Sequence, residues 1–156
     1  MADKHPLKIG TLHYLIRKKE VLLALKKRGF GKGMYNGIGG KVKRGESIIK
    51  TLKRETFEEI GVIPKDIVKM GLIKFKIGFE NWDMNVYVYI SKSWEGKPKE
   101  TDEMKPKWFP LSALPYRKMW PDDSYWMPLM LGGKQIKAEF VFDKNRKIKD
   151  FKIEPL

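Results

Sequence analysis

GKVKRGESIIKTLKRETFEEIGV, residues 40–62, is the stretch around which the chain is organised. Glu55, Glu58 and Glu59 follow one another at helical spacing, so a helix here presents all three on one face. Like charges so placed repel by a few tenths of a kcal/mol per pair, approximately. A solvated acidic face is the plainer interpretation, but the fixed spacing favours a bound cation. Clustered oxygen ligands suit Mg²⁺, or alternatively Mn²⁺.

The flanks of this stretch predict a helix. Ser47 is a suitable N-cap and Gly61 a suitable C-terminal stop. Apolar or small side chains form an inward stripe beside the acidic face: Ile49, Leu52, Thr56 and Ile60. The preceding GIGGKVKRGE is a glycine-rich loop, strand and loop, where the backbone can approach a ligand closely.

The same spacing resembles the Nudix box, G-x5-E-x7-R-E-U-x-E-E-x-G-U, in which U is apolar. The matching residues are Gly40, Glu46, Arg54, Glu55, Glu58, Glu59, Gly61 and Val62, and only Thr56 departs. The resemblance implies a hydrolase of nucleoside diphosphates linked to another moiety, with a divalent metal on the helix. It also implies an α/β fold in which a mixed sheet is sandwiched between helices.

Composition limits the class of protein. A chain of 156 residues without a long apolar run or a signal-peptide core predicts one soluble domain, 1–156, with a loose terminus at 1–6. The absence of cysteine excludes disulfides and a thiol nucleophile and is compatible with the cytoplasm. The net charge of +14 favours anionic partners, although scattered lysines do not favour a nucleic-acid groove. We expect a monomer that binds a nucleotide and no membrane.

Elsewhere, periodicity and turn residues predict the remaining elements. We expect strands at 9–17, 21–25, 37–42, 68–79, 84–90, 108–109, 135–142 and 147–153, and a second helix at 124–131. Residues 26–36 and 91–105 are expected to be polar loops. His5 and His13 have no motif around them and are interpreted as structural.

The segment 119–126, MWPDDSYW, places adjacent carboxylates between tryptophans. In one interpretation Asp122 or Asp123 caps the helix that follows and the aromatic residues are core. In the other, a part-buried pair of carboxyls keeps one proton near neutral pH. Such a pair offers both a donor and an acceptor to a purine edge, while an indole stacks on the base.

Three segments, KKRGFGKGMYNGIGGKV, TDEMKPKWF and MWPDDSYWMPL, resemble the MutT-like branch of the Nudix family that acts on oxidised purine nucleotides. This resemblance implies that Asn36, Asp122 and Asp123 bind the base and that Trp120 stacks on it. It places Phe75, Met84 and Trp126 along the pocket, with Thr11 and Lys26 nearby. Tyr35 departs from the family's tryptophan. The implied substrates are 8-oxo-dGTP and 2-oxo-dATP.

The resemblance also assigns the metal site. Glu55, Glu58, Glu59, Glu103 and the carbonyl of Gly39 are the implied ligands. Glu55 or Glu59 takes the proton of the attacking water, and Arg54 pairs with Glu46 to hold a catalytic glutamate in place. Two other functions stay open: a Nudix enzyme acting on other nucleotides, dinucleoside polyphosphates or capped RNA, and a nucleotide- or RNA-binding protein with an inactive box.

Overall fold

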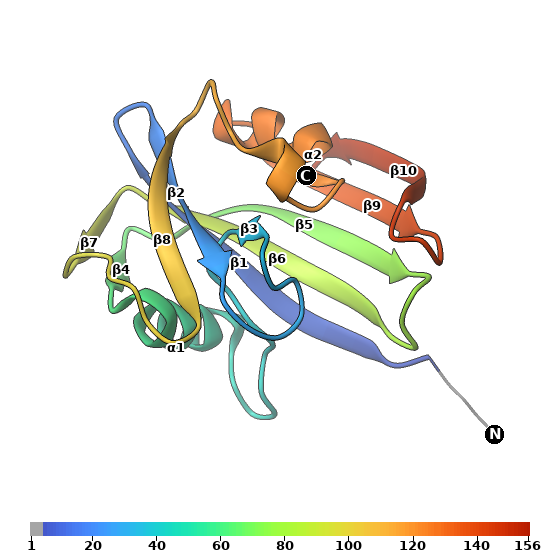
Figure 1. Ribbon diagram of the computed structural model, residues 1–156, viewed down its shortest axis with the longest axis horizontal. Helices are drawn as coiled ribbons and strands as arrows, with labels where there is room; N and C mark the ends of the chain where they lie inside the picture. The colour runs from blue at the N-terminus through green and yellow to red at the C-terminus, as the bar shows by residue number, and fades with distance from the viewer. Residues whose placement is uncertain (1–4) are drawn as a thin grey trace.

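An eight-stranded mixed sheet forms the centre of the molecule in the computed structural model, which describes residues 5–156. Its order is β10-β9-β5-β6-β1-β2-β3, and β8 also pairs with β2 (Figure 1). The pairs β1–β6 and β5–β9 are parallel, and the other pairs are antiparallel. The strands are β1 Leu7–Arg17, β2 Glu20–Lys26, β3 Tyr35–Asn36, β5 Val68–Ile77, β6 Asp83–Ser91, β8 Met104–Pro110, β9 Ile136–Phe142 and β10 Ile148–Pro155.

Each face of the sheet carries a buried cluster of side chains. Side chains alternate along the central strands, so neighbouring residues belong to different clusters. On β1, Tyr14 and Ile16 belong to one buried cluster, together with Trp126 of helix α2 (Asp123–Leu131). Leu15 points into the other cluster, together with Ile60 of helix α1 (Ile48–Ile60). The expected α/β fold, a mixed sheet between helices, is therefore confirmed.

Helix α1 begins and ends where its sequence predicts. The Ser47 hydroxyl oxygen accepts a hydrogen bond from the Lys50 amide at 3.1 Å, which pairs one of the free N–H groups of the first turn. Gly61 adopts a left-handed conformation with φ 74° and donates its amide to the Phe57 carbonyl. Helix α1, which carries the acidic face, is therefore capped at both of its ends.

Several predicted boundaries need correction. Residues 1–4 of the expected loose terminus lie outside the described residues, whereas Pro6 is tied down, since its carbonyl accepts from the Asp83 amide at 2.8 Å. The expected polar loop 91–105 contains β7 (Ser93–Glu95), which pairs with β4 (Ile63–Lys65). In place of a strand at 37–42 there are isolated bridges at Ile38 and Lys41. A short 3-10 helix, Tyr116–Lys118, precedes α2. No helix in the described part of the chain is long and apolar enough to cross a membrane.

Candidate functional site

Two glycines bring backbone against the acidic face of α1. Thr11 of β1 donates its amide to the Gly40 carbonyl at 3.0 Å, which fastens residues 39 and 40 to the sheet. A Cβ on Gly39 would lie 1.8 Å from the Thr11 carbonyl oxygen, and a Cβ on Gly40 would lie 2.4 Å from Glu55 Cδ. Only glycine permits such close contact at both positions. The loop and the helix therefore form the two walls of one acidic site.

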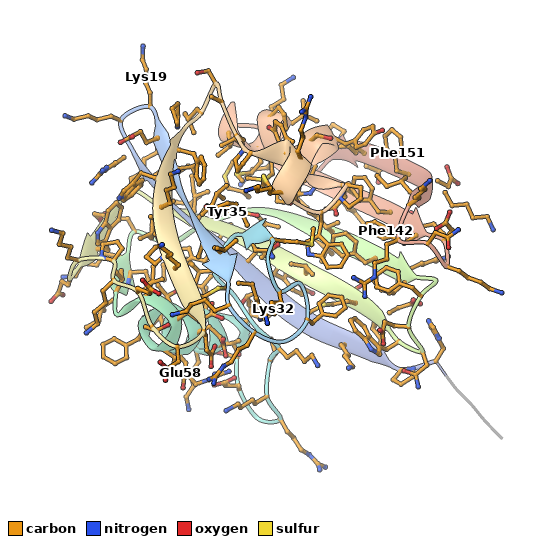
Figure 2. All side chains as sticks on the ribbon, in the orientation of Figure 1. Lys19, Lys32, Tyr35, Glu58, Phe142 and Phe151 are labelled. Carbon is orange, nitrogen blue, oxygen red and sulfur yellow. The ribbon has the colours of Figure 1, made fainter. Side chains whose placement is uncertain are left out.

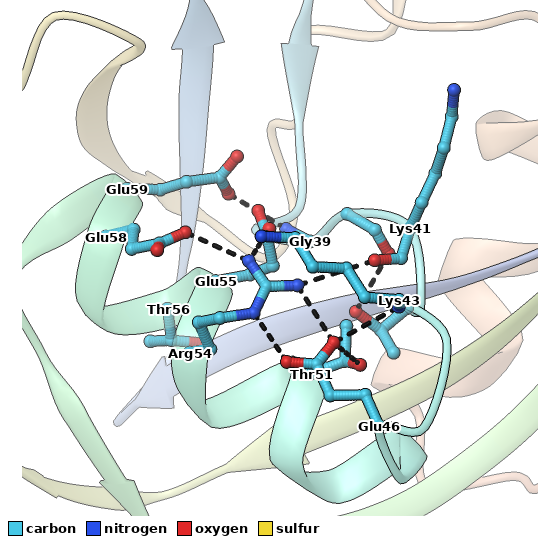
Figure 3. A network of polar contacts seen from close by, with 12 residues as sticks. Gly39, Lys41, Lys43, Glu46, Thr51, Arg54, Glu55, Thr56, Glu58 and Glu59 are labelled. Carbon is cyan, nitrogen blue, oxygen red and sulfur yellow. Dashed lines mark hydrogen bonds and ion pairs between the residues drawn. The ribbon is translucent and has the colours of Figure 1, made fainter.

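Arg54 is the centre of the polar network on α1 (Figure 3). Its Nε donates to Glu46 Oε2 at 2.6 Å, and a terminal nitrogen donates to Glu46 Oε1 at 3.0 Å. The other terminal nitrogen contacts Glu55 Oε1 at 2.5 Å and Glu58 Oε1 at 3.0 Å. These bonds lower the pKa of Glu46 to about 2 and raise that of Arg54. The predicted pairing of Arg54 with Glu46 is present, and Arg54 also positions Glu55.

Glu59 is the most buried carboxyl of the helix, with 2% of its surface exposed. Its Oε1 accepts the Gly39 amide at 3.0 Å. Burial, together with the nearby Glu55 carboxylate, raises the pKa of Glu59 to about 8. Burial also raises the pKa of Glu55, against the opposing effect of Arg54. A buried carboxyl beside a second one is an arrangement that a cation stabilises.

The side chains that are expected to bind metal are not gathered around one point in this structure. Among residues 5–156, no three carboxyl or imidazole groups are arranged as a ready set of ligands. Arg54 contacts Glu55 and Glu58, whereas Gly39 contacts Glu59. Glu103 lies near enough for its charge to raise the pKa of Glu59, and Lys26 lies near enough to lower it. The donors are oxygen atoms of the kind that hard divalent ions prefer, so their chemistry fits such an ion.

A cavity opens between the acidic site and α2. Its lining includes Gly39 and Gly40, which contact the acidic helix, and Asp122 and Asp123 at the start of α2. Eight of the nine residues expected to bind substrate line it: Thr11, Lys26, Asn36, Phe75, Met84, Trp120, Asp122 and Asp123. The ninth, Trp126, is absent from the cavity lining, since its ring is fully buried and its Nε1 donates to Asp122.

The two aspartates of the cavity lining are almost completely buried. Asp122 makes no side-chain bond that would cap α2, and instead its Oδ2 accepts from Trp126 Nε1 at 2.8 Å. Burial raises the pKa of Asp122 to about 6, although the bond from Trp126 opposes this shift. Burial and the neighbouring Asp122 raise the pKa of Asp123 well above its usual value. The pair can therefore hold a proton at neutral pH.

A comparison with known protein families finds that residues 6–130 match the NUDIX domain. The chain belongs to the Nudix family. This Nudix chain is 41% identical over 147 residues to the oxidized purine nucleoside triphosphate hydrolase of Danio rerio, covering 94% of each chain. It is 42% identical over 135 residues to the Mus musculus protein of that name, covering 86% of each. The MutT protein of Bacillus halodurans shares the fold, with a TM-score of 0.83, 23% identity, and 96% and 99% of the two chains covered.

Sequence reasoning missed several aromatic residues of the Nudix chain's cavity. Trp120 stacks on Phe30, with ring centroids 5.2 Å apart, and on Phe79, 6.0 Å apart. Trp82 and Phe142 also line the cavity. The sequence did contain an indication for two of them. Phe30 stands between glycines in a basic loop, and Phe142 continues the inward alternation of side chains along β9. No sequence pattern around Trp82, which lies in the turn before β6, indicated a place in the cavity.

Tyr35 stands where the resemblance expects tryptophan. Its ring packs edge-on against Phe109, with centroids 5.0 Å apart, and it projects from the short strand β3 (Figure 2). It is absent from the residues that line the cavity, whereas its neighbour Asn36 is present. The departure at Tyr35 therefore lies outside the cavity lining.

Proposed function

We propose that this Nudix protein hydrolyses oxidised purine nucleoside triphosphates, of the 8-oxo-dGTP or 2-oxo-dATP type, to the monophosphate and pyrophosphate. The observation that carries the proposal is the cavity itself. Its lining includes two buried aspartates of raised pKa, and also Gly39 and Gly40, which contact Glu59 and Glu55 of the acidic helix α1. The names of the Danio rerio and Mus musculus relatives support the same substrate class.

The base would be recognised by proton placement. An aspartate that keeps its proton donates a hydrogen bond, and an ionised neighbour accepts one. Oxidation of a purine changes which edge atoms carry hydrogen, so a pair of carboxyls that shares a proton can match the altered edge. The amide of Asn36 adds a donor and an acceptor, and the Trp120 ring supplies a stacking surface.

The acidic site would carry the bond cleavage. Glu55, Glu58, Glu59 and the Gly39 carbonyl would hold Mg²⁺, with Glu103 nearby. The ion supplies charge neutralisation on the phosphates and activation of water. Glu55 or Glu59 then takes the proton of the attacking water. Arg54 holds Glu46 and orients Glu55, and Lys26 meets the phosphate end of the substrate.

The decisive experiment measures pyrophosphate release with Mg²⁺ from dGTP, 8-oxo-dGTP, dATP, 2-oxo-dATP and a capped RNA. We expect a preference for the oxidised purines that is lost in Asp122→Ala and in Asp123→Ala. The exposed Asp150→Ala provides the matched control and should keep the preference. Activity confined to the other nucleotides or to capped RNA would contradict the assignment of the cavity. Binding of RNA without release of pyrophosphate would contradict hydrolysis altogether.

The proposal extends to a monomer in the cytoplasm. Sedimentation of the purified chain checks the monomer, and fractionation of cells that express the tagged protein checks the compartment.

A further inference from the structure

A buried chain of hydrogen bonds lies beneath α1, and none of its members has a role in the proposed reaction. His13, fully buried on β1, places its Nε2 2.7 Å from the hydroxyl oxygen of Ser91 on β6. Its Nδ1 lies 2.9 Å from the hydroxyl oxygen of Thr56 on α1. The Thr56 hydroxyl lies 2.7 Å from the Leu52 carbonyl. Four polar groups on three elements are thus joined inside the core.

The direction of each bond follows from the number of hydrogens available. Thr56 has one hydroxyl hydrogen, which it donates to the Leu52 carbonyl, so its oxygen accepts from Nδ1–H of His13. Burial lowers the pKa of His13 to about 4 and keeps the ring neutral at pH 7. Nε2 therefore accepts from the Ser91 hydroxyl. Every member is paired, and the chain is directional.

The backbone of His13 supports the opposite wall of the acidic site. Its amide donates to the Ile38 carbonyl at 2.6 Å, and its carbonyl accepts from the Ile38 amide at 2.9 Å. The next residue, Gly39, donates its amide to Glu59 at 3.0 Å. One residue of β1 therefore binds the glycine loop through its backbone and the acidic helix through its side chain.

We infer that His13 is a positioning residue for the acidic helix. Through Thr56 it sets the rotation of α1 about its axis, so that Glu59 keeps its bond from Gly39 and Glu55 stays against Gly40. The Nudix box has an apolar residue where this chain has Thr56, and an apolar side chain packs there without a directional bond. The geometric part of the inference is independent of the substrate, whereas its kinetic consequence rests on the proposed function.

The test replaces the polar members by apolar ones, in His13→Leu with Thr56→Val and Ser91→Ala. Exchanging all three leaves no unpaired side-chain group in the core, so the variant should fold. Without nucleotide or metal, hydrogen exchange at the Gly39 amide, followed by NMR, should become about tenfold faster. With substrate, kcat should fall about tenfold while KM for the nucleotide is unchanged, because only the acidic wall has moved.

Two matched controls separate positioning from stability. Thr56→Ser keeps the hydroxyl and should keep both the slow Gly39 exchange and the kcat, whereas Thr56→Val should lose both. Ile73→Val removes a methylene from the core on β5 and should lower Tm without changing either readout.

Wild-type exchange and kcat in the triple variant would show that the chain of bonds contributes packing alone, and would overturn the inference. If the triple variant does not fold, the comparison of Thr56→Ser with Thr56→Val decides the same point. If the wild-type protein releases no pyrophosphate, the proposed function fails, while the Gly39 exchange still decides the role of His13.

Discussion

At the scale of single residues, burial raises the pKa values of the carboxyl groups at the candidate site. The carboxyl of Glu59 is almost fully enclosed, and its pKa stands at about 8 in the folded chain against 4.5 for the exposed group. The folded state therefore binds more protons than the unfolded state between these two values, so stability falls as pH rises from about 4.5 to about 8. Buried carboxyl groups such as Glu59 are therefore stabilised by binding a proton or a cation.

Glu59→Gln should remove this dependence, since an amide does not ionise. We expect the variant to be more stable than wild type at pH 8, by on the order of 4 kcal/mol, and close to it at pH 4.5. Urea unfolding of both proteins without metal at the two pH values measures the difference. The same variant should keep its fold and lose turnover. Equal pH slopes for the two proteins, or near-normal activity in the variant, would contradict the role assigned to Glu59.

In the proposed function, Trp126 acts on base recognition through its hydrogen bond to Asp122. Its indole N–H stabilises the ionised form of that aspartate and so opposes the rise in pKa that burial causes. Trp126→Phe should raise the pKa of Asp122 further. The limb of the pH profile of kcat/KM that reports Asp122 should then move to higher pH. Trp94→Phe, on the distant strand β7, is the control and should leave the profile in place.

The residue scale also shows where sequence reasoning ends. The pairing of Arg54 with Glu46 could be predicted, because both lie on one local segment, whereas the contacts of Arg54 with Glu55 and Glu58 were not specified. Trp126 was assigned to the cavity wall because sequence gives its place on the helix without the depth at which the helix packs. The hydrogen bond between His13 and Thr56 joins residues that are 43 positions apart in the chain, so no local sequence pattern could predict it.

At the scale of elements, α1 is the part of the fold that the sequence specifies most fully. Its cap, its stop and three residues of its predicted inward stripe, Leu52, Thr56 and Ile60, agree with one helix. Ile49 was wrongly placed in that stripe, because its side chain is exposed. The short pair β4–β7 could not be foreseen, since each strand has only three residues and the paired Lys65 and Ser93 are 28 positions apart in the chain. Their pairing depends on the tertiary fold, which brings the two segments together.

The cap of α1 can be tested by itself. Ser47→Ala removes the acceptor of the Lys50 amide and should lower the free energy of unfolding by about 1 kcal/mol. Ser124→Ala, whose hydroxyl makes only an exposed contact of 3.5 Å with the Pro121 carbonyl, should cost much less. Urea midpoints of the two variants give the comparison. An unchanged midpoint in Ser47→Ala would mean that tertiary packing alone defines the start of the helix.

At the scale of the whole molecule, the net charge of +14 is the property that the fold does not explain. The acidic residues of α1 and the buried aspartates lie at the site, together with Lys26 and Arg54, and the exposed Lys134 and Lys152 lie outside the cavity lining. An anionic nucleotide is attracted by this long-range field, and the attraction weakens as salt shortens the Debye length to about 8 Å at physiological ionic strength. Charge far from the site should therefore affect substrate capture and not the chemical step.

Lys134→Glu with Lys152→Glu tests this effect, because both side chains are exposed and neither lines the cavity. Each exchange replaces +1 by −1, so the net charge falls from +14 by four. At low salt, KM for the nucleotide should rise by roughly twofold and kcat should stay unchanged, and at about 0.3 M salt the difference in KM should vanish. Lys134→Arg with Lys152→Arg keeps the charge and should behave as wild type. A fall in kcat, or a KM difference that persists at high salt, would place the effect in local structure, because screened long-range attraction cannot produce either result.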